Sequence, residues 1–518
     1  MIQFKFDNAF RRELPGDPES GARRREVRGA FWSDVQPTPV SRPRLIWHSA
    51  EVAASLGISE ADIASDAFAN VFGGNALVDG MQPWAANYGG HQFGHWAGQL
   101  GDGRAISLGE VIREGKRWEL QLKGAGPTPY SRGADGRSVL RSSIREFLCS
   151  EAMHHLGIPT TRALSLVRTG DSVVRDMFYD GNARAEPGAI VCRVAPSFIR
   201  FGNFELPASR GEIDLVRQLA DFTIQRDFPE LDGEGEYRYA EWFAQVCERS
   251  ARMVAGWMRV GFVHGVLNTD NLSILGLTID YGPYGWIDNF DAGWTPNTTD
   301  AQGRRYRFGQ QPAIVYWNLG RLAQALSSLF ADPVPLHAGL QRFVSTYSEC
   351  ERANTAAKLG LFKCSDEVLQ LMTRLQELMQ QAEVDMTIWF RSLVDLDIDA
   401  PDIAHFDDAF YNNELRREYD EALQTLLDDY AARVKADEFS AARRRTAMLA
   451  ANPRYVLRNY LAQQVIERAE RGDESGIAEL LDVMRHPYDD QPGRERFEEK
   501  RPDWARHKAG CSMLSCSS

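Results

Sequence analysis

The chain lacks the features by which membrane-spanning, secreted and general nucleic-acid-binding proteins are most easily identified. None of its apolar runs approaches the roughly 18 residues that a bilayer crossing requires. The first residues, MIQFKFDNAFRREL, carry charges where a signal peptide needs an apolar stretch. The formal net charge is −13, whereas a general nucleic-acid binder has a basic excess. We therefore expect a soluble, cytoplasmic protein that binds neither membrane nor nucleic acid.

The sequence also has no two cysteines spaced as in a CxxC motif. The seven cysteines are scattered, which is typical of reduced intracellular proteins. Two of them, Cys511 and Cys516, lie in the segment GCSMLSCSS, whose small polar residues predict a mobile tail with exposed thiols. The 518 residues contain no repeat or low-complexity linker and suffice for two or three units of about 100–200 residues each.

The segment from His264 to Gly282, HGVLNTDNLSILGLTIDYG, holds the densest group of candidate functional residues. Apolar, β-compatible residues flank Gly276, which predicts a tight hairpin that returns Asp280 to the neighbourhood of Asn271. Amide and carboxylate oxygens that converge in this way form a site of the kind that holds Mg²⁺ beside phosphates. Aligned with the kinase motifs HRDxxxxN and DFG, Asn271 and Asp280 occupy the metal-binding positions.

The same alignment places Val266 where a kinase has its catalytic aspartate, and a valine side chain cannot accept a proton. Asp270 is the only carboxylate of this loop that could take over the role. The segment therefore indicates a kinase-like phosphate site whose base has been lost or moved. The alternative is that Asp270 and Asn271 cap one turn and Asp280 begins another, as Asp and Asn often do.

Upstream, a glycine-rich segment precedes a strand that ends in a lysine. Gly101 and Gly103 lead into a β-compatible segment, and such a turn lets backbone N–H groups approach a phosphate. Asp102, at the predicted tip of the turn, would repel a phosphate, unlike an ordinary kinase glycine loop. Lys123 ends the alternating segment WELQLK, as the phosphate-gripping lysine of a kinase does. Taken singly, these features also fit an ordinary turn and an exposed strand-end lysine.

An amphipathic helix predicted over residues 137–156 favours the kinase-like interpretation, because glycine loop, lysine and helix glutamate then follow in the kinase order. The helix carries Glu146 and Glu151, and either is able to pair with the lysine. Further along, Arg193 and Arg200 bracket the end of a predicted strand. They are placed either to clamp phosphate oxygens or to form surface ion pairs.

The second half of the chain has mainly helical apolar spacing, from about residue 212 to about residue 485. We expect an α+β, bilobal fold of the protein-kinase (pseudokinase) type. Residues 1–205 would form an N-terminal surface arm and a β-rich lobe. Residues 206–518 would form a helical lobe with the catalytic loop 264–282, additional C-terminal helices and the cysteine-containing tail.

Several long blocks of the sequence resemble the selenoprotein O family. They include YGGHQFGHWAGQLGDGRA, LKGAGPTPYSRGADGRSVLRSSIRE, CRVAPSFIRFGNFE and HGVLNTDNLSILGLTIDYGPYGWID, and the similarity covers nearly the whole chain. The resemblance implies an enzyme with a protein-kinase-like fold that transfers AMP, not phosphate, from ATP to Ser, Thr or Tyr hydroxyls of proteins. It also implies that ATP binds in the reverse orientation, so that its α-phosphate meets the nucleophile.

The resemblance also implies a role for each residue of the site. Asp270 would be the general base, and Asn271 with Asp280 would hold Mg²⁺ or, as the alternative, Mn²⁺. Glu146 would orient the strand lysine. The nucleotide-binding positions would be Gly101, Gly103, Arg104, Lys123, Asp135, Gly136, Arg193, Arg200 and Asp280.

One position departs from the family, whose members often have a cysteine in the segment after the metal aspartate that pairs with the tail cysteine. This chain has Pro296 at the apparent position, so that disulfide cannot form in its usual way. Instead Cys511 and Cys516 would pair with each other, or Cys516 would act as a redox-active thiol. Two other functions remain open: a catalytically inactive nucleotide-binding scaffold, which Val266 would favour, and a protein kinase that uses Asp270 as a displaced base.

Overall fold

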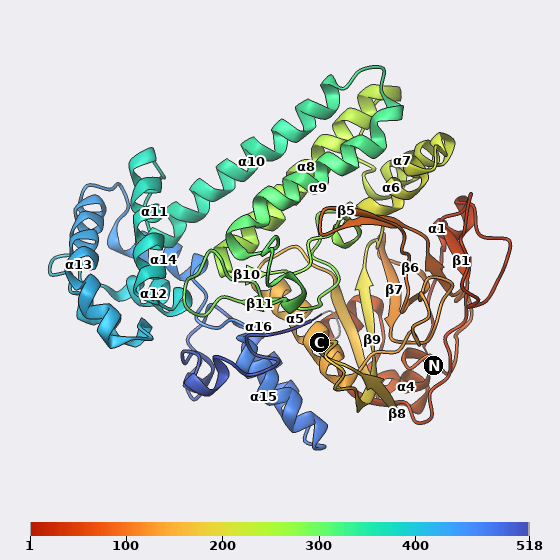
Figure 1. Ribbon diagram of the computed structural model, residues 1–518, viewed down its shortest axis with the longest axis horizontal. Coiled ribbons are helices and arrows are strands. Elements are labelled where there is room, and N and C mark those ends of the chain that lie inside the picture. The colour runs from red at the N-terminus through yellow and green to blue at the C-terminus, as the bar shows by residue number, and fades with distance from the viewer. Residues whose placement is uncertain (1, 516–518) are drawn as a thin grey trace.

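The computed structural model describes residues 2–515, which form a lobe built on a β-sheet and a lobe built of helices (Figure 1). The sheet has seven antiparallel strands in the order β1-β3-β6-β7-β9-β8-β2. They are β1 (Trp32–Asp34), β2 (Arg44–His48), β3 (Trp84–Ala86), β6 (Ala105–Arg113), β7 (Lys116–Lys123), β8 (Arg162–Arg175) and β9 (Arg184–Ala195). The expected β-rich N-terminal lobe is confirmed.

Helices cover both faces of this sheet. Helix α5 (Leu140–His155), the predicted amphipathic helix, packs on β8 and β9 and is buried along nearly its whole length. Helices α2 (Ala50–Leu56), α3 (Glu60–Ile63) and α4 (Asp66–Phe72) lie on the lobe's other side. Residues of β9 alternate between the two cores, with Val191 on the α5 side and Ile190 and Cys192 on the other.

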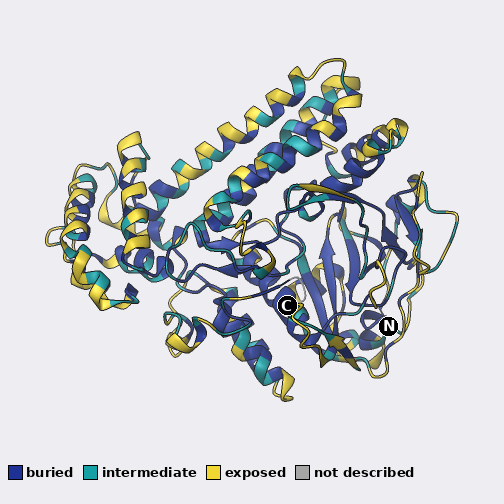
Figure 2. Cartoon of the chain, in the orientation of Figure 1, coloured by how far each residue is buried: buried dark blue, intermediate teal, exposed yellow. Residues whose placement is uncertain are grey.

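The helical lobe contains three long helices side by side and a separate cluster at its far end (Figure 1). The long helices are α8 (Gly235–Val260), α9 (Gln311–Leu326) and α10 (Val334–Leu359), preceded by α6 (Phe201–Ser209) and α7 (Ile213–Asp227). The cluster comprises α11 (Asp366–Gln381), α12 (Met386–Ser392), α13 (Asn413–Lys435) and α14 (Ala441–Ala451), with a core of its own. Each of these helices has one buried face turned toward the core and one exposed face (Figure 2).

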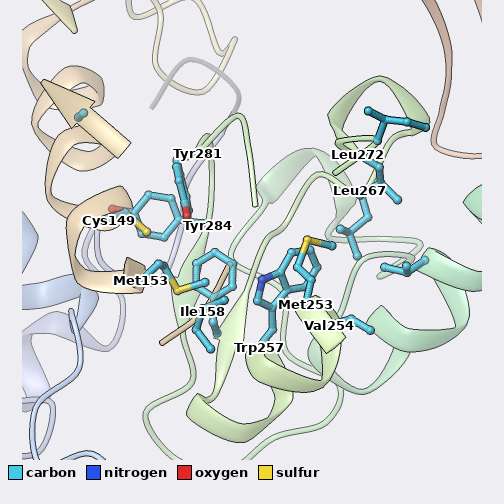
Figure 3. Close-up of a cluster of buried hydrophobic side chains, with 14 of the residues drawn as sticks. Cys149, Met153, Ile158, Met253, Val254, Trp257, Leu267, Leu272, Tyr281 and Tyr284 are labelled. Atoms are coloured by element: carbon cyan, nitrogen blue, oxygen red, sulfur yellow. The ribbon is translucent and has the colours of Figure 1, made fainter. Parts of the chain in front are cut away.

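The last two helices return to the sheet lobe. Helices α15 (Asn459–Glu470) and α16 (Ser475–Arg485) pack against α5. The same region carries the segment 264–284, which a cluster of buried side chains from α5 and α8 holds (Figure 3). Trp257 of α8 donates its indole N–H to Thr278 Oγ1 at 2.9 Å, and Arg145 of α5 bonds the Tyr284 carbonyl at 2.6 Å. Both lobes therefore position this segment.

Residues 2–45 do not form the expected surface arm. They contain helix α1 (Ala9–Glu13) and strand β1, which pairs with β3 at the sheet edge. Phe10 and Phe31 are buried in the main core, and Phe10 stacks on Trp84 with ring centroids 4.6 Å apart. The proline and charge content suggested an arm, but these apolar side chains gain more from burial.

The C-terminal segment also differs from the expectation, because up to residue 515 it is docked. Leu514 is fully buried; its N–H donates to the Pro296 carbonyl at 2.9 Å and its carbonyl accepts from Thr298 N at 2.7 Å. Cys511 is 2% exposed, and burial raises the pKa of its thiol to about 11. The expectation of an exposed thiol there is wrong, and Cys516 lies outside the described residues. No helix within residues 2–515 has the length and apolar character needed to cross a bilayer.

Candidate active site

The strand lysine and the helix glutamate form a buried ion pair. Lys123, at the end of β7, places Nζ 2.7 Å from Oε2 of Glu146 on α5. Burial lowers the pKa of Lys123, and the Glu146 charge opposes that shift. Glu151, the other candidate, instead binds Arg162 at 2.6 Å and Ser49 at 2.7 Å. The pairing of a strand lysine with a helix glutamate is the one that active kinases require.

Both arginines that bracket the end of β9 bind Asp280. Arg193 donates to Oδ1 of Asp280 and, at 3.2 Å, to Oε1 of Glu146, whereas Arg200 donates to Oδ2 of Asp280. The two arginines are 3% and 2% exposed, so the possibility of surface ion pairs is excluded. Burial acts to raise the pKa of Asp280, but the guanidinium groups of Arg200 and Arg193 hold it well below its usual range.

The backbone at Asp280 is in the left-handed region, with φ of +57°. A non-glycine residue in this region costs about 1 kcal/mol or more and is retained where surrounding contacts over-determine it. Part of the predicted hairpin is present: Leu272 pairs with Thr278 through a single antiparallel bridge, and Gly276 turns with φ of +67°. That register puts Asn271 opposite Ile279, one residue from Asp280. The turn is confirmed, whereas the two regular strands expected around it are absent from this segment.

Asp270 lies on a short 3-10 helix, Thr269–Asn271, and is 7% exposed. Burial raises its pKa to about 7. Its Oδ2 accepts from Gln92 Nε2 at 3.2 Å, and its backbone carbonyl accepts from Arg200 at 2.9 Å. Its Oδ1 is buried and has no hydrogen-bond partner within residues 2–515. An unpaired buried oxygen is costly, which marks this atom as a candidate for function.

A hairpin that the sequence did not reveal covers Asp270. Strands β4 (Gly89–Gln92) and β5 (His95–Gln99) pair outside the main sheet. His91 N donates to Thr269 Oγ1 at 2.7 Å, and a Cβ at Gly90 would lie 2.5 Å from Asp270 Oδ1. The GGHQ sequence of β4 is therefore required for the hairpin to approach the catalytic loop so closely.

Asp102 was expected to project from the tip of the glycine loop, where it would repel a phosphate, but it points into the protein instead. It is 3% exposed and accepts from Ala86 N at 3.1 Å and Tyr88 Oη at 3.2 Å. Burial raises its pKa above the usual value. Gln121 links it to the arginines, since its Nε2 lies 3.3 Å from Asp102 and its Oε1 accepts from Arg193. Gln121 precedes Lys123 by two residues, so strand alternation could have identified it as a member of the same face.

The glycine loop lies against the loop that follows β7. Gly101 has φ of +70°, and a Cβ there would lie 2.3 Å from the Tyr130 ring. A Cβ at Gly103 would lie 2.9 Å from the Tyr130 carbonyl. The Arg104 carbonyl accepts from Gly124 N at 2.7 Å, and the charge of Arg104 contributes to the lowered pKa of Lys123. Both loops therefore meet at the end of β7.

Asp135 and Gly136 lie on that second loop. Gly136 has φ of +66°, and a Cβ there would lie 2.1 Å from the Gly126 carbonyl. The Asp135 side chain is 46% exposed and pairs with Arg175 at 2.6 Å. It thus takes no part in the buried network around Asp280.

The oxygen atoms of Asn271 and Asp280 fit a hard divalent cation. Asn271 donates Nδ2 to the Val266 carbonyl at 3.0 Å, which fixes the amide and leaves Oδ1 with no hydrogen-bond donor among the described residues. Both Asp280 oxygens are engaged by arginines that the sequence predicts to hold phosphates. A nucleotide and its cation could therefore exchange with these pairs, with phosphates replacing Asp280 on the arginines.

Comparison with known proteins identifies the family. The family model described as protein adenylyltransferase SelO matches residues 22–485. The chain is 70% identical over 519 residues to Protein nucleotidyltransferase YdiU of Xanthomonas axonopodis pv. citri (strain 306), with 100% of both chains covered. It is equally similar, over the same length, to the protein of that name from Xanthomonas euvesicatoria pv. vesicatoria (strain 85-10).

Among solved structures, the chain resembles ROP2 from Toxoplasma gondii, described as a virulence factor with a protein-kinase fold and no enzymatic activity. The two are 14% identical, over 57% of this chain and 86% of that chain, with a TM-score of 0.23. So distant a likeness adds nothing to the assignment. The family model and the full-length relatives decide it: the chain belongs to the family of protein adenylyltransferase SelO.

Proposed function

We propose that this protein transfers AMP from ATP to the hydroxyl of a Ser, Thr or Tyr residue of a protein substrate, with release of pyrophosphate. The observation that carries the proposal is the buried cluster of Lys123, Arg193 and Arg200 around Asp280, beside the unpaired carboxylate oxygen of Asp270. The cluster offers cations for phosphate, and Asp270 offers a base. Membership of the adenylyltransferase family supports AMP as the group transferred.

Phosphate binding would use charges that are already fixed in place. Lys123 and Arg193 share Glu146, while Arg193 and Arg200 share Asp280. Three cations thus gather around Glu146 and Asp280, and phosphate oxygens could bind the same guanidinium and ammonium groups. Arg104 and the glycine loop would complete the nucleotide site, with backbone groups approaching the phosphates.

Asn271 and Asp280 would hold Mg²⁺ or Mn²⁺, and either ion would neutralise phosphate charge when bound. Asp270 would accept the proton of the substrate hydroxyl as its oxygen bonds to the α-phosphorus. The bond between the α-phosphorus and the bridging oxygen breaks, and pyrophosphate leaves with that electron pair. A pKa of about 7 suits this role, because a base works best when its pKa lies near the working pH.

Two alternatives use the same residues. A kinase would present the γ-phosphorus to Asp270, and an inactive scaffold would bind ATP without turnover. The complete set Lys123, Glu146, Asp270, Asn271 and Asp280 argues against a scaffold. We also propose that the reaction takes place in the cytoplasm, which is supported by the cysteines within residues 2–515, all unpaired and mostly buried.

The test uses ATP labelled at the α-phosphate or at the γ-phosphate, supplied with Mg²⁺ and then with Mn²⁺, and follows label into protein. We expect label from α-labelled ATP only, together with free pyrophosphate. Protein labelled from the γ-position would identify a kinase, and ATP bound without transfer of either label would identify a scaffold. Asn271→Ala should abolish labelling and, unlike a change at Asp280, leaves the arginine pairs intact.

A further inference from the structure

Four arginines near the catalytic loop have no acidic partner. Arg304, Arg305 and Arg307 lie in the segment after the metal aspartate, and Arg321 lies on α9. Within residues 2–515 no carboxylate comes within the 4.0 Å of an ion pair with any of them, although Asp and Glu outnumber Lys and Arg by 72 to 59. In so acidic a protein, a cluster of unpaired cations requires an explanation.

A buried carboxylate beside this cluster is used otherwise. Asp300 is 3% exposed, and its oxygens accept from the backbone N–H groups of Arg305 at 2.9 Å and of Tyr306 at 2.7 Å. It shapes the turn and leaves the guanidinium groups free of ion pairs. The positive charge of the segment is therefore available to a ligand.

Two of the four guanidinium groups, those of Arg305 and Arg321, are held by ring stacking. Arg305 lies over the Trp317 ring at 4.7 Å from its centroid, and Arg321 lies over the same ring at 5.0 Å. The Nε atoms of both arginines are buried with no hydrogen-bond partner in the described part of the chain. Stacking orients a guanidinium while its N–H groups stay able to bind carboxylate oxygens in pairs.

A hollow of about 600 Å³ adjoins these side chains and is lined by Phe93, Gln302, Arg305, Arg307 and Gln310, among others. One end of it is tied to the catalytic loop. Tyr306 Oη donates to Asn268 Oδ1 at 2.7 Å and accepts from Phe93 N at 2.8 Å. Gln92, adjacent to Phe93, binds the Asp270 carboxylate. A chain lying in the hollow would therefore pass close to the base.

We propose that an arginine groove, the hollow lined by Arg305 and Arg307 with Arg304 and Arg321 flanking it, docks an acidic segment of the protein substrate beside the hydroxyl that receives AMP. The inference rests on the proposed function and names its substrate class. Carboxylates of the segment would bind the guanidinium groups and place the neighbouring hydroxyl at Asp270. A nucleic acid fits less well, because the net charge of −13 repels a dense polyanion.

The test measures binding and transfer separately, with the full chain. The probes are fluorescein-labelled peptides with one central Ser, Thr or Tyr, flanked by Glu in one set and by Gln in the other. We expect the Glu peptides to bind about tenfold more tightly than the Gln peptides, which two or three exposed ion pairs would supply. The double variant Arg304→Gln/Arg307→Gln should lose this difference, and added salt should reduce it.

The matched control is Arg417→Gln/Arg471→Gln, which removes the same charge from exposed, unpaired arginines on α13 and after α15. It should bind both sets as the parent does. Arg304→Gln alone, at an exposed position, guards against a folding defect in the double variant and should lose part of the preference.

Equal binding of the two sets, no binding of either, or an undiminished preference in the groove variants would overturn the proposal. Tighter binding of a single-stranded oligonucleotide of equal charge would overturn it in favour of nucleic acid. Peptide binding without transfer of α-label would leave the docking groove standing and contradict the proposed function instead. Transfer of α-label to both peptide sets at equal KM would support the proposed function and contradict the docking groove.

Discussion

Lys358 is a buried cation without a carboxylate partner, and its removal should stabilise the protein. It lies on α10 and is 6% exposed; its Nζ donates to the Arg259 carbonyl at 3.1 Å and stands 4.1 Å from the Phe390 ring centroid. No ion pair to it occurs within residues 2–515. Burial, with a smaller contribution from the Arg259 charge, lowers the pKa of Lys358 from 10.5 to about 7.

The size of the effect follows from that pKa. At about 1.4 kcal/mol per unit of pKa, a fall from 10.5 to about 7 costs the folded state about 5 kcal/mol when Lys358 is charged. The unfolded chain binds the extra proton between these two values, so the free energy of unfolding rises with pH across this window. Below it both states are protonated and the penalty is complete. Near pH 9 about half of it remains.

Lys358→Met keeps an unbranched, flexible side chain that is one atom shorter and removes the charge. We expect it to raise the free energy of unfolding near pH 7 by about 2–4 kcal/mol, allowing about 1 kcal/mol for the lost hydrogen bond. Its advantage should shrink as the pH approaches 10. Calorimetric unfolding at several pH values measures both the gain in the free energy of unfolding and its decrease with pH. Lys358→Arg, which stays charged, should show no such pH dependence. A Met variant no more stable than the parent at neutral pH, or one with a constant advantage, would refute the reasoning.

Two further predictions concern the hairpin and the tail. Gly90→Ala places a methyl group against Asp270 and should reduce the rate of AMP transfer about a hundredfold while the affinity for ATP stays unchanged. Gly320→Ala, where a methyl group meets open space, is the control. A single-turnover rate of the Gly90 variant equal to that of the parent would contradict this. Leu514→Asp puts a charge at a fully buried position and should release the tail to limited proteolysis, whereas Met513→Asp, at a 40% exposed neighbour, should not. An undigested tail in the Leu514 variant would show that its docking depends on other contacts.

The sequence predicts the main elements of the site because their order along the chain follows from chemistry. A lysine ending an alternating strand and a glutamate on the next amphipathic helix must face each other if the helix covers the sheet. The sequence could not choose between Glu146 and Glu151, because both lie on the same helix and both are buried, so apolar spacing does not separate them. Contacts from distant segments, Arg162 among them, decide which glutamate is free.

The parts that could not be predicted depend on contacts between distant segments. Gln92 and Asp270 are separated by 178 residues, and no local pattern in GGHQ indicates that it covers a catalytic loop. Asp102 sits between glycines, as a residue at a turn tip would, yet Ala86 and Tyr88 draw it inward. The tail is polar in composition, but backbone hydrogen bonds and one leucine fix it. In each case tertiary contacts outweigh local propensity.

The central claim is that one pocket binds ATP through Lys123, Arg193 and Arg200, while Asp270 performs a separate step as the base. Asp270→Asn tests it most directly, because the amide keeps the shape of the side chain and removes its capacity to accept a proton. We predict that this variant binds ATP with the parent's affinity and transfers α-label to protein at least about a hundredfold more slowly. Transfer at the parent's rate, or loss of ATP binding together with transfer, would contradict the account.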